Sequence, residues 1–364
     1  MNICMLSELF YPFMLGGAER RYYEIAVRLA KKHNVTVSSL RFRGHEDREY
    51  HRGVEIIRTG IKHPLDTRRL PPLATYAPAL FQSIRGNFDV IDANQGIASF
   101  VGVFKPFVSE PIIATFHDIY WNQWNEYFPF PFSSFGKTME FAWSKLGYSK
   151  IIAVSEFTMK KLKYLGFRSP VEVIPSGIDN KVINRITASK KDLSIVFVGR
   201  LVKYKNVDML LKACAMLQEQ YPELILKIVG SGPEEANLKK SARSLGVNAR
   251  FYGFVSEEEK FKLIKSSTVL VNPSSVEGLG LILIESMACG TPIIAQDIDT
   301  YYFCNRKNSI LYANESEMRK KLSVVLGDQK MRKRLGKEGT KTSKEFSWDS
   351  VAQKIEDVYE SVVK

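Results

Sequence analysis

The sequence predicts an α/β protein made of two Rossmann-like domains, each with a largely parallel sheet. Short apolar runs rich in Val and Ile alternate with longer amphipathic segments along most of the 364 residues. Polar and apolar residues do not alternate within these runs, which is typical of parallel strands covered on both faces. A polar stretch, 180–192, divides the pattern in two, and a chain of this length accommodates two domains.

The first half supplies its elements in strand–helix order. Apolar runs predict strands at 2–6, 35–40, 54–58, 88–92, 111–116, 151–154 and 171–174. Helical spacing of apolar residues predicts helices at 17–32, 137–147 and 156–165.

The second half repeats the scheme. Its predicted strands are 194–199, 225–230, 268–272 and 291–295, and its predicted helices are 206–220, 234–245, 257–266 and 280–289. The closing stretch 347–363 has the spacing of one amphipathic helix. We therefore expect domains at residues 1–180 and 181–346, followed by a terminal helix within 347–364.

The composition is that of a soluble globular protein, with 45% hydrophobic and 25% charged residues. No apolar run reaches the roughly 18 residues needed to span a bilayer, and the apolar start lacks the basic region of a signal peptide. The four cysteines are not at metal-ligand spacing, so we expect reduced thiols and a cytoplasmic protein. The net charge of +13 favours anionic partners, although a generally basic solvated surface explains it as well.

Ligands of doubly wound sheets bind outside the carboxyl ends of the strands, so the residues after each strand are the candidates. After the run 268–272 comes Glu277, then the loop and helix start Gly278, Leu279, Gly280 and Leu281, with Glu285 inside the helix. Free amides at a helix start bind phosphate, and carboxylates accept hydrogen bonds from sugar hydroxyls. An ordinary glycine-turned helix start with a favourable first-turn acid remains an equal alternative.

A second candidate follows the strand at 194–199, where Arg200 and Lys205 stand in a loop. Cations at a strand end suit a diphosphate, because Arg grips phosphate with two N–H groups and Lys adds a point charge. Two solvated loop charges are the common alternative.

Two further candidates lie in the first half. Gly16 and Gly17 open a helix after the first strand, where their amides suit a phosphate, although glycine pairs often only form turns. His117 ends the buried run 111–116, so it is placed to donate to a sugar hydroxyl or to shield developing charge. The alternative is a strand end capped by the turn at Asp118.

In combination, these motifs resemble the retaining glycosyltransferases of family 4, whose fold is named GT-B. The resemblance rests on an ordered set that covers nearly the whole chain: GGAER (16–20), HD (117–118), SE (155–156), PSGID (175–179), GRL with Lys205, IVGSGPE (228–234), FYGFV (251–255) and Glu277-x7-Glu285. It implies two facing Rossmann-like domains with a donor cleft, and a terminal helix that packs back on the first domain.

The resemblance also implies roles for the candidates, toward a donor that is a nucleotide-diphosphate sugar, UDP- or GDP-linked. Gly16 and Gly17 would approach the diphosphate, which Arg200 and Lys205 would balance. Glu277 would bind the transferred sugar, with Gly278 to Leu281 on its phosphate side, and Glu285 would bind the ribose. The backbone at Phe254 and Val255 would border the base, and His117 would contact the sugar near the reacting carbon.

The resemblance implies retention of the anomeric configuration, and no cofactor or required metal is expected. No carboxylate here is an obvious covalent nucleophile, which favours front-face attack. The pair Asp297 and Asp299 has a spacing that binds manganese in a different glycosyltransferase fold, but here it follows a strand of a Rossmann-like domain, and we interpret it as a polar loop. The segment after Ala295 departs from the family pattern, which leaves the donor preference open.

The acceptor side is less defined, and a glycan or a lipid-linked acceptor fits. The aromatic-rich segment 119–135 suits an acceptor groove, or equally a Pro-rich core loop. Lys62, Arg68 and Arg69 precede an apolar segment, a pattern that suits peripheral docking on an anionic membrane, at its inner face.

Other function classes are a non-catalytic nucleotide-binding protein of the same fold, a nucleotide-sugar epimerase and a phosphorylase. A nucleic-acid partner is not expected, because basic and acidic residues interleave and no RNA- or DNA-binding module is present.

Overall fold

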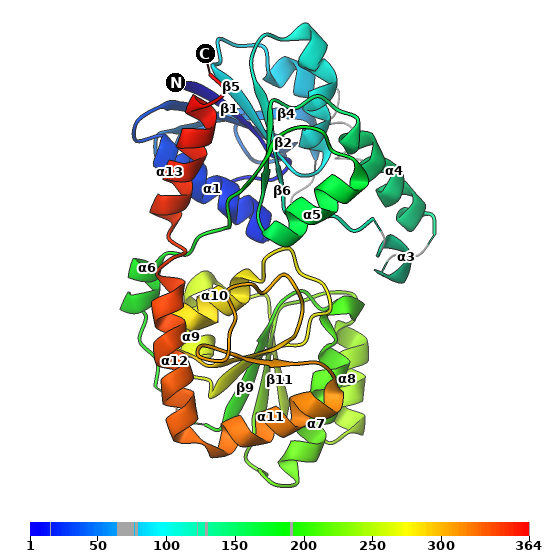
Figure 1. Ribbon diagram of the computed structural model, residues 1–364, viewed down its shortest axis with the longest axis vertical. Coiled ribbons are helices and arrows are strands. Elements are labelled where there is room, and N and C mark those ends of the chain that lie inside the picture. The colour runs from blue at the N-terminus through cyan, green and yellow to red at the C-terminus, as the bar shows by residue number, and fades with distance from the viewer. Residues whose placement is uncertain are drawn as a thin grey trace. The chain divides into compact units, whose positions relative to one another are not determined.

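The computed structural model describes residues 1–14, 16–63, 76, 79–121, 123–127, 130–189 and 192–363. The chain forms two compact units, one of Met1–Gly177 with Trp348–Lys364 and one of Ile178–Ser347 (Figure 1). The division predicted from the sequence has its boundaries three residues after the first of these junctions and one residue before the second.

The first unit holds an eight-stranded sheet, counted over the described residues, in the order β3-β4-β2-β1-β5-β6-β7-β8. Its strands are β1 (Asn2–Leu6), β2 (Asn34–Phe42), β3 (Arg48–His51), β4 (Val54–His63), β5 (Val90–Asn94), β6 (Ile112–Phe116), β7 (Lys150–Ala153) and β8 (Val171–Val173). The described pairings are parallel except for β3, which runs antiparallel to β4 at the sheet edge.

Two layers of helix cover this sheet. One face packs on α1 (Gly17–Leu29) and α13 (Trp348–Glu360). The other packs on residues 76–84 where described, and on η1 (Ile97–Phe107), α4 (Phe132–Ser144) and α5 (Glu156–Leu165). The short α3 (Trp124–Tyr127) contacts α4.

The terminal helix α13 lies beside α1 (Figure 1). Tyr359 is fully buried, and its hydroxyl donates to Asp92 at 2.5 Å, while Tyr22 donates to the other carboxylate oxygen at 2.8 Å. Burial raises the pKa of Asp92. A helix from the end of the chain is therefore tied into the core of the first unit by apolar packing and one buried polar contact.

The second unit holds a six-stranded sheet, again over the described residues, in the order β11-β10-β9-β12-β13-β14. Its strands are β9 (Ser194–Val198), β10 (Ile225–Val229), β11 (Ala249–Gly253), β12 (Val269–Asn272), β13 (Ile293–Gln296) and β14 (Ile310–Tyr312), and the described pairings are parallel.

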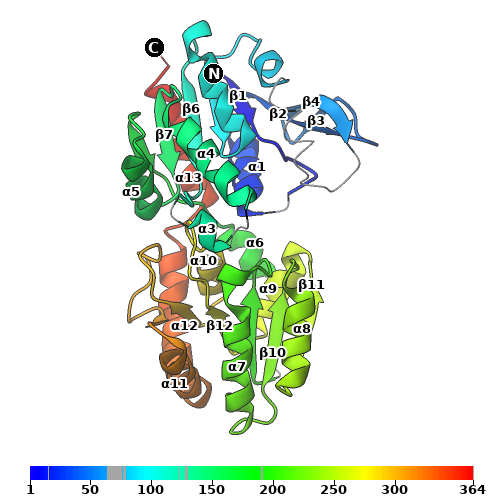
Figure 2. The ribbon, with the colours of Figure 1, turned by 90° about the vertical axis from the view of Figure 1, so that its right-hand side faces the viewer.

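The helices of the second unit enclose this sheet. They are α6 (Asn180–Arg185), η2 (Lys203–Lys205), α7 (Val207–Gln218), α8 (Glu235–Ser244), α9 (Glu257–Lys265), α10 (Leu281–Ala288), α11 (Glu315–Gly327) and α12 (Gln329–Ser343). α7, α8 and α11 share one core with the sheet, and α7 and α8 lie side by side (Figure 2).

Both sheets contain a topological switch point, where the chain reverses the direction in which it adds strands. In the first unit β1 lies between β2 and β5, and in the second β9 lies between β10 and β12. The carboxyl ends of such a strand pair form the usual ligand crevice of doubly wound sheets. The loops after β1 and β5, and those after β9 and β12, are therefore the expected positions of a ligand site.

The structure adds elements that the sequence patterns did not predict. The polar stretch after residue 180 contains α6, which Asp179 caps by accepting from the Val182 amide. β3, β11 and β14 are edge or outer strands, and α11 and α12 are strongly polar helices, so none shows a clear apolar run. Within the described part of the chain, no helix combines the length and apolarity required to cross a membrane.

Candidate active site

The loop that follows β12 carries Glu277 at the switch point of the second unit. Lys205 places its Nζ 2.5 Å from the Oε1 of Glu277, and the amide of Asn272 donates to the same oxygen at 3.3 Å. Both members of the ion pair are largely buried but not sealed, since their side chains are 13% and 15% exposed. Lys205 and Glu277, two residues predicted from the sequence and 72 positions apart, thus form one ion pair at the carboxyl ends of the strands.

Lys205 ends η2, the short helix after β9, and Arg200 begins the same loop. The Nη2 of Arg200 donates to the hydroxyl of Tyr204 at 2.9 Å, and the Lys205 ammonium lies 5.6 Å from the centre of the Tyr204 ring. Tyr204 is buried and was not predicted. It is the common support of the two cations.

The residues directly after Glu277 contribute backbone amides next to this pair in the chain. The N–H groups of Gly278, Leu279, Gly280 and Leu281 have no hydrogen-bond partner among the described residues. Gly280 has a φ of 78° and lies against Tyr301, whose ring carbon would be 2.5 Å from an added Cβ. Only glycine meets both conditions. A helix start with unsatisfied amides, close to the Lys205–Glu277 pair in the chain fold, has the chemistry that suits an anion.

The segment after Ala295, which departs from the family pattern, holds the Glu277 loop in place through two hydrogen bonds. Asn272 donates to the Tyr301 hydroxyl at 3.0 Å, and the Thr300 hydroxyl donates to the backbone oxygen of Glu277 at 2.8 Å. None of these three residues was predicted from the sequence. The signal for Asn272 was available, because a polar residue ending a buried apolar strand needs a partner.

Glu285 lies in the second turn of α10 and pairs with Lys260 of α9, at 2.8 Å. Burial acts to lower the pKa of Lys260, but the carboxylates of Glu285 and Glu257 outweigh it and raise that pKa. Phe254 and Val255 follow β11, and Phe254 is 74% exposed. Lys260 was not predicted, because it sits inside a charge-rich helix where lysine is ordinary.

In the first unit His117 follows β6 and contacts Asn94, the last residue of β5, with Nε2 to Oδ1 at 2.8 Å. The amide of Asn94 donates to the Ser7 hydroxyl at 3.1 Å, and that hydroxyl donates to the oxygen of Leu9 at 2.8 Å. Since Asn94 presents its oxygen to the ring, we assign the proton of His117 to Nε2. The Nδ1 atom is then an acceptor.

Gln95 fixes the backbone around this histidine. Its Oε1 accepts from the amides of His117 at 2.6 Å and of Asp118 at 3.1 Å, and its Nε2 donates to the Asp118 oxygen. Burial, and then the positive charge of Arg21, lower the pKa of His117 to about 3. The imidazole is therefore neutral at pH 7. We expect it to accept a hydrogen bond through Nδ1, in place of the donation predicted from the sequence.

Gly16 is the N-cap residue of α1, and Gly17 is the first residue of that helix. Among the described residues, no side chain caps this helix start, and Gly16 has extended backbone angles. The predicted glycines therefore stand at the start of a helix, in the loop after β1.

The aromatic segment after His117 is partly described. Glu140 of α4 accepts from the Tyr120 amide at 2.8 Å, and burial raises the pKa of Glu140 to about 7. By contrast, Phe130, Phe132, Phe135 and Phe141 are 81%, 50%, 55% and 48% exposed. Lys62 lies near the end of β4, whereas Arg68 and Arg69 lie outside the described residues.

Comparison with known proteins now identifies the chain. The model described as Glycosyl transferases group 1 matches residues 179–342, and the model described as Glycosyltransferase Family 4 matches residues 15–182. The chain belongs to the family 4 glycosyltransferases. A curated relative of this glycosyltransferase is the phosphatidyl-myo-inositol mannosyltransferase of Mycobacterium leprae, 27% identical over 304 residues, or 79% of this chain and 78% of the relative.

Solved structures agree on the fold. The sucrose-phosphate synthase of Thermosynechococcus elongatus superposes with a TM-score of 0.85 at 19% identity, covering 99% of this chain and 98% of that one. HepE of Anabaena, solved with UDP and glucose, gives a TM-score of 0.75 at 19% identity, with 99% and 100% covered. The predicted α/β class with two parallel-sheet domains of the GT-B type is confirmed, as is the assignment as a transferase enzyme.

Proposed function

We propose that this glycosyltransferase moves a hexose-type sugar from a UDP- or GDP-linked donor to a glycan or lipid-linked acceptor. The observation that carries the donor proposal is the grouping of Lys205, Glu277 and the open amides of Gly278 to Leu281 at one switch point. Such a group presents a cation and a carboxylate beside a helix start, which suits the phosphate and the sugar of one nucleotide sugar.

The chemistry follows from charge. Breaking the bond between the anomeric carbon and its phosphate oxygen leaves a nucleoside diphosphate and an oxocarbenium-like sugar. Lys205, Arg200 and the loop amides would stabilise the developing phosphate charge, since they are already held by Glu277, Tyr204 and the helix start. Preorganised donors of this kind need no rearrangement when the bond breaks.

Two carboxylates would bind the two sugar rings of the donor. We propose that Glu277 accepts from hydroxyls of the transferred sugar and that Glu285, fixed by Lys260, accepts from ribose hydroxyls. Phe254 and Val255 would border the base. In the first unit, Gly16 and Gly17 would offer amides to the diphosphate, and the neutral His117 would accept from a sugar hydroxyl through Nδ1.

A donor panel tests this proposal. UDP- and GDP-linked hexoses are compared by calorimetry and by release of nucleoside diphosphate, because similar proteins include a GDP-mannose-dependent mannosyltransferase and UDP complexes. Binding of one donor that is lost in Lys205→Ala and retained in Lys203→Ala is the expected result. A chain that binds none of these donors contradicts the proposal.

We propose retention of the anomeric configuration with front-face attack. The carboxylate of the donor loop, Glu277, is engaged by Lys205 and Asn272, which disfavours a covalent role for it. Proton NMR of the first product formed reports its anomeric configuration directly. An inverted product excludes this mechanism.

We propose that turnover requires no metal ion. Asp297 and Asp299 are exposed after β13, and the part of the chain that the structure describes holds no cluster of three His, Cys, Asp or Glu suited to a metal. Lys205 and Arg200 supply the charge that a metal would bring. Full activity in a chelator is expected, and loss that manganese restores would reverse this view.

We propose a lipid-linked acceptor reached by peripheral docking on an anionic membrane. The relative in Mycobacterium leprae is named for a phosphatidyl-myo-inositol substrate. In this chain the exposed Phe132 and Phe135 lie on α4, with Lys137 on the same helix and Lys145 as its C-cap residue. Apolar side chains flanked by lysines suit an anionic bilayer surface.

Sedimentation with vesicles of anionic or neutral phospholipid tests this surface. Phe132→Ser/Phe135→Ser should release the protein from anionic vesicles, whereas Val324→Ser on α11, where Val324 is 52% exposed, should not. Equal sedimentation of all three proteins, or none at low salt, counts against docking through α4.

A further inference from the structure

A hollow lies at the end of the second unit's sheet opposite to the proposed donor loop. It has a volume of about 570 Å³ and is entirely within the second unit. Leu193 and Thr268 line it, and they directly precede β9 and β12. The donor candidates follow the carboxyl ends of these same two strands, so the hollow is at the opposite, amino edge of the sheet.

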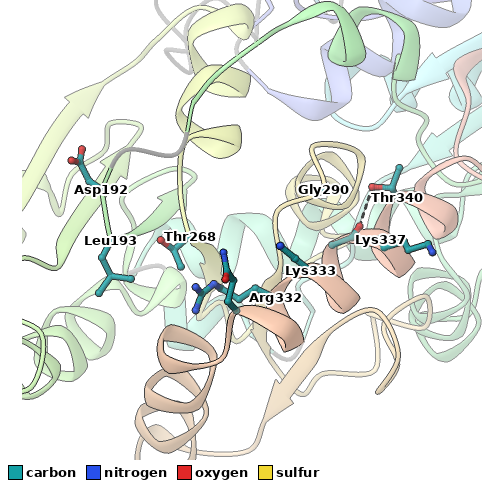
Figure 3. A pocket seen from close by; sticks show the side chains of 10 residues that line it. Asp192, Leu193, Thr268, Gly290, Arg332, Lys333, Lys337 and Thr340 are labelled. Carbon is teal, nitrogen blue, oxygen red and sulfur yellow. Dashed lines mark hydrogen bonds between the residues drawn. The ribbon is translucent and has the colours of Figure 1, made fainter.

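The facing wall is one side of α12. Six residues of the helix line the hollow at helical spacing: Gln329, Arg332, Lys333, Gly336, Lys337 and Thr340. Figure 3 shows Arg332, Lys333 and Lys337 in a row along α12, with Asp192, Leu193 and Thr268 across from them. We call this hollow the α12 pocket.

The α12 pocket is positively charged. Its lining holds three cations, Arg332, Lys333 and Lys337, against the single acid Asp192. Within the described residues, neither Lys333 nor Lys337 has an ion-pair partner within 4 Å. Arg332 is held in place, because its Nη1 donates to the backbone oxygens of Val325 at 2.6 Å and Leu326 at 2.5 Å. An anion would therefore meet one fixed and two adaptable cations.

The pocket is preformed by close packing of its walls. Gly336 touches the chain at Gly290, where an added Cβ would lie 2.3 Å from the Gly290 oxygen. The Thr340 hydroxyl donates to the Met287 oxygen at 3.1 Å, which fixes α12 against α10. A volume of this size exceeds what a bare phosphate fills and lies within the usual range for small-molecule sites.

We propose that the α12 pocket is a second binding site, for a phosphate-bearing small molecule. Arg332, Lys333 and Lys337 bind the phosphate, and the remaining volume toward Thr268 and Thr340 holds the polar body that carries it. This site is independent of the proposed donor function, because no donor candidate lines it.

Titration calorimetry at low ionic strength tests the site with two probes, inorganic phosphate and glucose 6-phosphate. Lys333→Ala/Lys337→Ala should weaken binding at least tenfold. The control Lys330→Ala/Lys344→Ala removes two exposed lysines of the same helix region that do not line the pocket, and should change binding less than twofold. Tighter binding of glucose 6-phosphate supports a phosphorylated sugar, and equal binding supports free phosphate.

A second variant separates this site from the donor site. Binding of the probes should persist in Arg200→Ala/Lys205→Ala, and hydrogen exchange should show new protection at 329–340. Two outcomes would overturn the proposal: no saturable binding of either probe, or binding that Arg200→Ala/Lys205→Ala abolishes and Lys333→Ala/Lys337→Ala leaves intact. The first outcome leaves the donor panel unaffected, and the second would place the probes at the proposed donor site instead of the α12 pocket.

Discussion

The two units are built alike but place opposite kinds of polar chemistry at their switch points. In each, an asparagine ends the strand added after the reversal, Asn94 in β5 and Asn272 in β12. Asn94 holds the neutral ring of His117, whereas Asn272 holds a carboxylate, Glu277, that Lys205 also pairs.

The difference has a physical origin in what surrounds each asparagine. Arg21 is fully buried in the first unit, and its charge together with burial disfavours a second cation, so His117 stays neutral. In the second unit the cation is Lys205, whose ammonium lies directly on the Glu277 carboxylate as an ion pair. The same topology thus yields one hydrogen-bonding site and one ionic site.

The largest expected effect is at the ionic site. Lys205→Ala should lower turnover by about two to three orders of magnitude, because it removes a fixed cation beside the departing phosphate and breaks the ion pair with Glu277. Release of nucleoside diphosphate measures it. Lys203→Ala, an exposed lysine of the same short helix, should stay within about twofold by the same comparison of rates. Similar rates for both variants would remove Lys205 from the proposed machinery.

A smaller effect is expected at the neutral site. His117→Gln should lower kcat by about tenfold to a hundredfold, equivalent to about 1.4–2.7 kcal/mol of barrier. Because the pKa of His117 is lowered to about 3, the NMR signal of its ring should not titrate between pH 5 and 8. A titration midpoint near 6.5 would show that His117 gains a proton near neutral pH, and the contrast between a neutral site and an ionic site would then be lost.

The same histidine predicts a pH dependence of stability. Its pKa in the folded protein is below that of the unfolded chain, so the unfolded chain takes up the proton first. Folding stability should therefore fall as the pH drops below about 6.5 toward 3. Urea unfolding at pH 7 and pH 5 should show a larger loss in the wild type than in His117→Gln.

Lys260 tests whether the ionic character extends along α10. Lys260→Ala should raise the KM for the donor about fivefold to tenfold, with kcat little changed, because it removes the ion pair that positions Glu285 and leaves the groups at the reacting bond in place. Lys262→Ala, an exposed lysine of α9, is the matched control. A fall in kcat with unchanged KM would contradict the ribose role of Glu285.

The smallest effect concerns a carboxyl group of the first unit. Burial raises the pKa of Glu140 to about 7, so the folded protein loses stability as the pH rises from about 4.5 through 7. Glu140→Gln keeps an acceptor for the Tyr120 amide. It should be more stable than the wild type at pH 8, on the order of 1 kcal/mol, and equal at pH 5. In contrast to this effect on stability, Glu277→Gln should impair turnover at both pH 5 and pH 8.

The repeating strand and helix pattern was predictable because parallel strands need apolar residues on both faces. β1 and α5 have the bounds that their apolar patterns predicted. Elements with one solvent-exposed side, such as β3 and α12, were not predicted, because their many polar residues obscure the apolar periodicity.

The fold class, the family and the candidates at the strand ends could be predicted from the residues alone, because these depend on local periodicity and on the spacing of motifs. The pairing of the candidates became visible only in the folded chain: Lys205 with Glu277, Glu285 with Lys260, and His117 with Asn94. Partner choice and protonation depend on distances and burial between segments far apart in the chain, which no local pattern records.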